Sequence, residues 1–184
     1  MKRWMTVLGT IGVTMTSVGC GVALDPVQPD GATQAIAILA QDLPPTSGNQ
    51  QSLGAAPGSL VLMWSNRPEL CSDPEIGDVC ADAIVWQGTL VLPPDLVRVG
   101  PVDLSDPSVS ASDAVFGNSV CAGGGASGGA PGGTMEILSI DATTITVDLI
   151  DGIPGASGSL TYSDGTTVNT DVTIKGTFTI PRCP

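Results

Sequence analysis

Apolar and polar residues alternate along parts of this chain with the period of two that is typical of β-strands with one buried face. The clearest case is DVTIKGTFTI, residues 171–180, in which every even position except Gly176 is apolar. TITVDLI, residues 144–150, alternates in the same way. Both stretches therefore predict half-buried strands. The residues expected to point inward are Ile145, Val147, Leu149, Val172, Ile174, Phe178 and Ile180, and those expected to point outward on the last stretch are Thr173, Lys175, Thr177 and Thr179.

Two earlier apolar stretches also predict strands. LVLMWSN, residues 60–66, is apolar at consecutive positions, as in a central strand buried on both faces. DAIVWQGTLVLPP, residues 82–94, keeps large apolar residues on one parity and ends at two prolines. Turn signals that indicate hairpins lie at residues 141–143 and at the Asp164-Gly165 pair. Fifteen prolines and the lack of a sustained helical period oppose long helices.

The sequence therefore predicts an all-β fold, an antiparallel β-sandwich or barrel, over residues 60–184. The part before it, residues 34–59, is a short apolar run followed by a loop rich in Pro, Gly and Ser. The run itself, residues 34–43, fits a strand or a short helix, because periodicity does not decide so short a segment. We expect it to dock on the β domain or to lie at its periphery.

The run CAGGGASGGAPGG, residues 121–133, raises the question of a phosphate-binding loop. Such a loop needs a lysine and a Ser or Thr at the start of a helix. This run has no lysine, contains Pro131 and leads into a strand-like stretch. The sequence thus predicts no nucleotide binding here. We expect a flexible loop within one domain, fixed at Cys121.

The first nineteen residues have the pattern of an export signal peptide. Lys2 and Arg3 precede an uncharged apolar stretch, residues 4–16. That stretch is shorter than the ~20 residues of a membrane-spanning helix. It is followed by the four residues Ser17-Val18-Gly19-Cys20.

This motif resembles the lipobox of bacterial lipoproteins. The resemblance implies cleavage before Cys20, lipid attachment to that cysteine, and a polar tether over residues 20–33. Gly21, where aspartate would signal retention, implies transfer to the outer membrane under the enteric sorting rule. Ser17 stands where a large aliphatic residue is usual, and this leaves a second possibility, cleavage by ordinary signal peptidase near Ala23 to give a soluble secreted protein.

Cysteine usage agrees with export. Without Cys20, four cysteines remain, and an even number in an oxidising compartment predicts two disulfides. Sequence alone allows three pairings. We favour Cys71–Cys80, which closes a short loop of turn-forming residues, and Cys121–Cys183. Zinc is excluded as an alternative by the spacing and by the lack of histidine.

Charge narrows the possible partners. The chain has a formal net charge of −12, and two of its six basic residues lie in the leader. So acidic a surface repels nucleic acid and anionic lipid head groups. The expected membrane contact is therefore the N-terminal lipid, and the nature of a protein or glycan partner stays open.

The absence of histidine removes Ser-His-Asp and Cys-His catalysis and most transition-metal sites. Lys175 is expected to point outward into solvent, which does not suit a general base. Paired carboxylates could hydrolyse glycosides, but six aromatic residues leave few to stack on sugars. We therefore expect a non-catalytic envelope module for binding or structure, with a carboxylate-dependent exported hydrolase as a weaker alternative.

Calcium is the more reasonable use of the acidic residues. Flexible acidic loops supply the six to eight oxygen ligands that calcium takes, although no EF-hand motif is present. The best candidate ligands surround the loop 71–82, and they predict a calcium-dependent ligand-binding or adhesion module as the second functional hypothesis. These residues are Asp73, Glu75, Asp78 and Asp82, with further acidic pairs at Asp103 and Asp106 and at Asp148 and Asp151.

Overall fold

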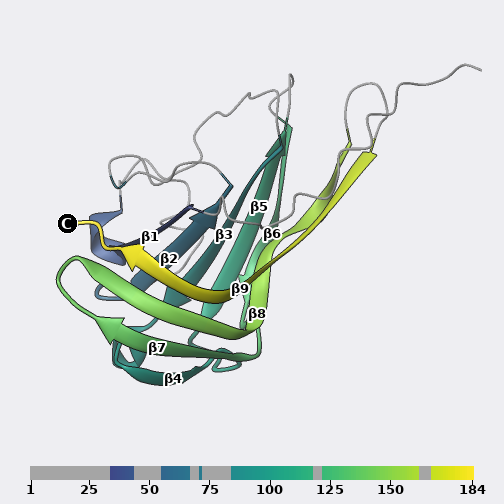
Figure 1. Cartoon of the computed structure of the whole chain (residues 1–184). Coiled ribbons are helices and arrows are strands. Elements are labelled where there is room, and N and C mark those ends of the chain that lie inside the picture. The colour runs from purple at the N-terminus through teal and green to yellow at the C-terminus, as the bar shows by residue number, and fades with distance from the viewer. Residues whose placement is uncertain (1–33, 44–54, 67–70, 72–83, 118–121, 162–166) are drawn as a thin grey trace, which may run out of the picture.

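The computed structural model describes residues 34–43, 55–66, 84–117, 122–161 and 167–184, together with Cys71 (Figure 1). These residues form nine strands and two short 3-10 helices. The strands are β1 (Gln34–Leu39), β2 (Leu60–Ser65), β3 (Ile84–Leu92), β4 (Gly100–Asp103), β5 (Ser110–Gly117), β6 (Ala122–Gly129), β7 (Thr134–Ile140), β8 (Thr144–Thr161) and β9 (Thr167–Pro181), and the helices are η1 (Ala40–Asp42) and η2 (Pro94–Leu96).

The strands form two antiparallel sheets that face each other (Figure 1). The five-stranded sheet has the order β1-β2-β3-β5-β6, and the four-stranded sheet has the order β4-β7-β8-β9. A single parallel bridge, Ala37 with Arg182, joins the β1 edge of the first sheet to the end of β9. The prediction of an all-β, sandwich-like fold is confirmed, and the described strands do not close into a barrel.

The alternation of β9 is as predicted. Val172, Ile174 and Ile180 are buried and Phe178 is half-buried against the core. The intervening Thr173, Lys175, Thr177 and Thr179 are exposed. Along β8, Ile145, Val147 and Leu149 are fully buried. The period of two therefore located both the strands and the faces that they bury.

The central position of β2 is also confirmed, since all six of its residues are buried. Leu60, Leu62 and Trp64 point into the between-sheet core. Val61 and Met63 point to the opposite face and belong to a second apolar cluster, hereafter the outer cluster. Its other members are Ile36, Ile38, Ala40, Leu43 and Val91, with Ala55 and Cys183 packed against them. Sequence 60–65 is apolar at every position but the last because both faces of the strand are covered.

The apolar run 34–43 resolves into both predicted forms. Residues 34–39 are β1, which pairs with β2 along its whole length, and residues 40–42 form η1. The backbone N–H of Ala40 donates to the carbonyl of Ser59 (2.9 Å), which fastens η1 beside the start of β2. This run is thus an edge strand of the five-stranded sheet.

The prediction of a flexible loop at residues 121–133 is wrong for most of its length. Residues 122–129 form β6, which pairs antiparallel with β5 from Ala111↔Gly129 to Gly117↔Ala122. Glycine has a low intrinsic preference for strands, but that preference is worth only ~1 kcal/mol and depends on context. Pairing with β5 provides partners for backbone groups of β6, and this outweighs the preference. Cys121 lies outside the described residues.

The predicted turn at 141–143 is confirmed, because β7 and β8 are joined there and pair from Ile140↔Ile145 onward. The second predicted hairpin is confirmed by its strands, β8 and β9, which pair as far as Thr161↔Thr167. Its turn, with Asp164 and Gly165, lies outside the described residues.

The hairpin of β8 and β9 changes direction at its middle. Between Leu149↔Gly176 and Ile153↔Ile174 the strand β8 holds two extra residues, so the ladder bulges there. Gly152, within the bulge, has φ = +81°, a conformation that favours glycine. Beyond the bulge, β8 lies against β3, β5 and β6 of the other sheet.

The two sheets are in tight contact at a pair of glycines, Gly88 and Gly155. A Cβ atom placed on Gly88 of β3 would lie 3.0 Å from the backbone of Gly155 of β8 and 2.9 Å from Ile174 Cδ1. A Cβ atom on Gly155 would lie 2.7 Å from Ile174 Cγ1. Both positions therefore require glycine for the bent half of β8 to pack on the five-stranded sheet.

Candidate functional site

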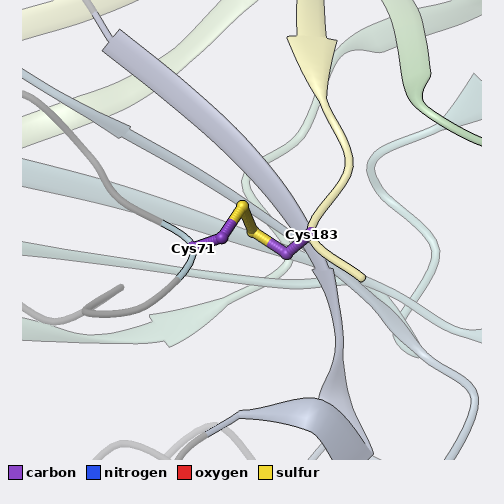
Figure 2. The surroundings of a disulfide bond; sticks show 2 residues. All are labelled: Cys71 and Cys183. Carbon is purple, nitrogen blue, oxygen red and sulfur yellow. A yellow bond between two sulfur atoms is a disulfide. The ribbon is translucent and has the colours of Figure 1, made fainter.

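A disulfide joins Cys71 to Cys183, with a Cα–Cα distance of 5.2 Å (Figure 2). It links the connection between β2 and β3 to the next-to-last residue of the chain, 112 positions away in sequence. This corrects the predicted pairing, since Cys71–Cys80 and Cys121–Cys183 cannot form when Cys71 and Cys183 bond each other. The short spacing of Cys71 and Cys80 was misleading, because tertiary structure brings the chain end beside β1.

Backbone hydrogen bonds hold the chain end in place for this disulfide. The N–H of Cys183 donates to the carbonyl of Ala37 (2.7 Å), and the N–H of Arg182 donates to that of Thr143 (2.8 Å). The guanidinium of Arg182 also donates to the backbone carbonyl of Asp141. Residues 182–183 thus connect β1 with the β7–β8 turn and close the seam between the two sheets, and Cys183 covers part of the outer cluster.

The β7–β8 turn is organised by one carboxylate. Asp141 Oδ1 accepts hydrogen bonds from the backbone N–H groups of Thr143 (2.7 Å) and Thr144 (2.8 Å), and their hydroxyls also donate to this carboxylate. The backbone N–H of Thr143, followed by the hydroxyl of Thr144, holds the pKa of Asp141 well below its usual range. Asp141 therefore acts as a turn cap next to the seam.

Several residues predicted for functional sites lie outside the described part of the chain. They are Cys20, the cysteines Cys80 and Cys121, and the calcium candidates Asp73, Glu75, Asp78 and Asp82. The structure therefore places only one end of the acidic loop 71–82, where Cys71 is bonded to Cys183.

The acidic residues of the connection between β4 and β5 bond to their own backbone. Asp103 Oδ1 accepts from the N–H of Ser105 (2.8 Å), and Asp106 Oδ1 accepts from the N–H of Ser108 (2.8 Å) and from its hydroxyl (2.5 Å). The hydroxyl of Ser108 and then its N–H lower the pKa of Asp106. These are turn caps of the kind that Asp commonly provides.

The two carboxylates of the other acidic pair, both on β8, accept hydrogen bonds from different strands. Asp148 Oδ1 accepts from the hydroxyl of Thr177 on β9 (3.2 Å), while Asp151 Oδ2 accepts from the N–H of Thr134 at the start of β7 (2.9 Å). Within the described residues, no three acidic or cysteine side chains come together as metal ligands would. The structure thus uses these four aspartates to organise turns and strand pairs.

Neither of the shifted carboxylates resembles a general acid. The pKa values of Asp106 and Asp141 are both lowered, whereas a carboxyl that donates a proton to a glycoside needs a raised pKa. Lys175 lies exposed on the outer face of β9, as its position in the alternating strand predicts.

Two tryptophans lie buried in the core between the sheets. Trp64 of β2 and Trp86 of β3 are fully buried, and neither indole N–H has a hydrogen-bond acceptor among the described residues. No pattern in the sequence indicates unpaired donors, because the surroundings of an indole nitrogen depend on tertiary packing.

The part of the chain that the structure describes includes no helix with the length and apolar character needed to cross a membrane. Comparisons with protein-family models, with curated proteins and with solved structures found nothing that matches this chain.

Proposed function

We propose that this protein is exported, is anchored through lipid on Cys20 to the outer membrane, and presents its β domain as a non-catalytic module for binding or structure. The observation that carries the proposal is the Cys71–Cys183 disulfide together with the leader. Structural disulfides belong to oxidising compartments outside the cytoplasm. Two unrelated features, one at each end of the chain, thus support export.

The position of β1 suits a lipid tether. The thirteen residues 21–33 lead directly into Gln34, the first residue of β1. A random-coil tether of thirteen residues would have an end-to-end distance of about 20 Å, and a fully extended one would span about 45 Å. Because the tether joins the domain at Gln34, we expect the end of the five-stranded sheet that carries Gln34 and Ser65 to face the membrane. The opposite end, with η2 and the β4–β5 connection, is farthest from it and is the end best placed to meet a partner.

Metabolic labelling with palmitate tests the anchor. Wild-type protein should incorporate label, and the Cys20→Ala variant should not. Cys71→Ala is a matched control, since it removes a cysteine outside the lipobox and should still label. Equal labelling of wild type and Cys20→Ala, or no labelling of either, contradicts the proposal.

The destination of the anchored protein is tested separately. Under the sorting rule implied by the lipobox resemblance, wild type should fractionate with the outer membrane and Gly21→Asp with the inner membrane. Fractionation of labelled wild type with the inner membrane would contradict the outer-membrane assignment and leave the lipid anchor intact.

A calcium-dependent binding module is the second candidate. It is favoured by one observation: Cys71, at the start of the acidic loop 71–82, is fixed to the chain end, which lowers the entropy lost when the loop orders around a cation. Millimolar calcium should then raise the melting temperature of wild type, and Asp78→Asn combined with Asp82→Asn should abolish the rise. An unchanged melting temperature in wild type rules against calcium.

A further inference from the structure

The outer face of β1, β2 and β3, which is turned away from the four-stranded sheet, is buried almost completely. Met63 is 1% exposed, and even the polar residues Ser65, Gln87 and Thr89 are at most 6% exposed. A sheet face that is buried to this extent has another layer of chain packed on it. The strand register and the alternation of side chains place nine residues on this face in three rows, Gln34–Ser65–Gln87, Ile36–Met63–Thr89 and Ile38–Val61–Val91, of which Gln34 alone is exposed.

The described helices and strands leave one end of this face without a covering element. All nine described strands belong to the two sheets. The helix η1 directly follows Leu39, and η2 follows soon after Leu92, which is level with Leu60 in the register. Both helices therefore lie at the end of the face where β2 begins. The opposite end, with Ser65 and Gln87, is buried without a described helix or strand on its outer side.

The connection between β2 and β3 is longer than the two strands need. β2 ends at Ser65, which pairs with Gln87 near the start of β3. Adjacent antiparallel strands are commonly joined by about two to five residues. Here eighteen residues, 66–83, lie between Ser65 and Ile84. The connection therefore has length available to cover a face of the sheet.

The disulfide fixes the middle of this connection against the sheet (Figure 2). Cys71 is bonded to Cys183, whose backbone N–H donates to the carbonyl of Ala37 in β1. Ala37 is level with Leu62, three positions back along β2 from Ser65. The connection thus turns back along the sheet after β2 ends. Because Cys183 packs against the outer cluster, it does so on the outer face.

The second part of the connection, residues 72–83, then has to return across the buried rows. It starts level with Ala37, hence with Leu90 of β3, and ends at Ile84, which is six residues along β3 from Leu90. With about 3.4 Å per residue and about 4.8 Å per strand, this path is about 22 Å long. The direct path crosses β2 at Ser65, next to Met63. Thirteen steps of extended chain span about 45 Å, so the segment has ample length to follow the face.

The composition of residues 72–83 suits this position. Ile76 and Val79 are the only large apolar residues in the segment. Two other segments outside the described residues are less well placed. Residues 44–54 join Leu43 to Ala55, and both of these residues pack with the outer cluster near η1. Residues 21–33 lead into Gln34, which is exposed.

We propose that residues 72–83 lie across the outer face of the five-stranded sheet and that Ile76 and Val79 complete the outer cluster beside Met63. On this side the domain then presents to a partner an acidic segment anchored by the disulfide, instead of the apolar face of the sheet. The carboxylates that become part of this surface are those of Asp73, Glu75, Asp78 and Asp82.

Nuclear magnetic resonance of the oxidised mature protein, labelled at the methyl groups of Met, Ile, Leu and Val, tests the proposal in wild type. The methyl group of Met63 should show Overhauser cross-peaks to a methyl group of Ile76 or Val79. The absence of both contacts overturns the proposal. Cross-peaks to Leu53 in their place would assign the cover to residues 44–54, and cross-peaks to Val22, Leu24 or Val27 would assign it to residues 21–33.

A double-mutant cycle in urea tests the same contact by its energy. Met63→Ala and Ile76→Ala should be non-additive, with a coupling of about fivefold or more in the unfolding equilibrium constant, as expected for side chains in contact. Leu53→Ala is the matched control, because it shortens an apolar residue of the other connection, and it should be additive with Met63→Ala. Additivity of Met63→Ala with both Ile76→Ala and Val79→Ala would contradict the proposal.

Discussion

Replacing both Cys71 and Cys183 with serine removes a covalent link that closes a loop of 112 residues. In the chain-entropy treatment, a loop of this length lowers the entropy of the unfolded chain enough to stabilise the fold by about 5 kcal/mol at 25 °C. The value depends only weakly on loop length, since a doubling changes it by about 0.6 kcal/mol. Because the hydrogen bonds of residues 182–183 do not involve the sulfur atoms, the native contacts of the seam are available to the variant as well.

Reversible denaturation in urea measures this loss directly. The double variant should unfold with a free energy about 3–5 kcal/mol below that of the oxidised wild type. The melting temperature should fall by about 10–15 °C for a domain of this size. The slope of free energy against urea should rise, because the unfolded variant exposes more surface than a cross-linked chain. Dithiothreitol should destabilise wild type by more than it destabilises the double variant, which lacks the Cys71–Cys183 bond but keeps Cys80 and Cys121. A loss below about 1 kcal/mol, with an unchanged slope, would refute the argument that the disulfide acts mainly on the unfolded chain.

Two substitutions and one disulfide-mapping experiment test the fold further. Gly88→Ala should destabilise the domain by about 1–3 kcal/mol in urea, because its Cβ meets backbone atoms of Gly155, whereas Gly129→Ala, with no atom within 4 Å of the added Cβ, should have little effect. Asp141→Ala should lower the melting temperature at pH 7. Because the pKa of Asp141 is lowered in the folded state, its stabilisation is complete above about pH 4 and is lost as the pH falls through the folded pKa. The melting-temperature difference between wild type and the variant should therefore shrink in acid, and equal differences at pH 7 and pH 2 would contradict this prediction. With Cys71 and Cys183 joined, the even count of cysteines predicts that Cys80 and Cys121 form the second disulfide. The strand register supports this pairing, because it aligns Ile84, Gly117 and Ala122 at one end of the sheet, and Cys80 and Cys121 lie close to these residues in sequence. Non-reducing peptide mapping that finds either thiol free would count against the prediction.

The strands could be predicted because burial constrains the sequence: a strand with one buried face alternates apolar and polar residues, and a strand with two buried faces is apolar at nearly every position. The alternation of residues 171–180 and the unbroken apolar run 60–65 correspond to one buried face of β9 and two of β2. Each pattern needs only the position of a residue relative to its own strand. The turn at 141–143 was predictable for the same reason, since Asp141 bonds to residues two and three positions ahead.

The predictions that were wrong or missing concern contacts between segments that are far apart in the sequence. β6 has the composition of a linker, and only its pairing with β5 makes it a strand. The disulfide follows from the adjacency of β1 and the end of β9, which the sequence does not encode locally. The unpaired indole donors depend on how two strands place their side chains in the core. The calcium candidates and Cys20 lie outside the described residues and stay predictions.

The mass of the N-terminal peptide of the protein purified from membranes tests the central claim most directly. A peptide that begins at Cys20 and carries the added mass of a diacylglycerol, with or without a further acyl chain, is the predicted result. A peptide that begins at Met1, or an unmodified one that begins after Ala23, would contradict a lipid-anchored envelope protein.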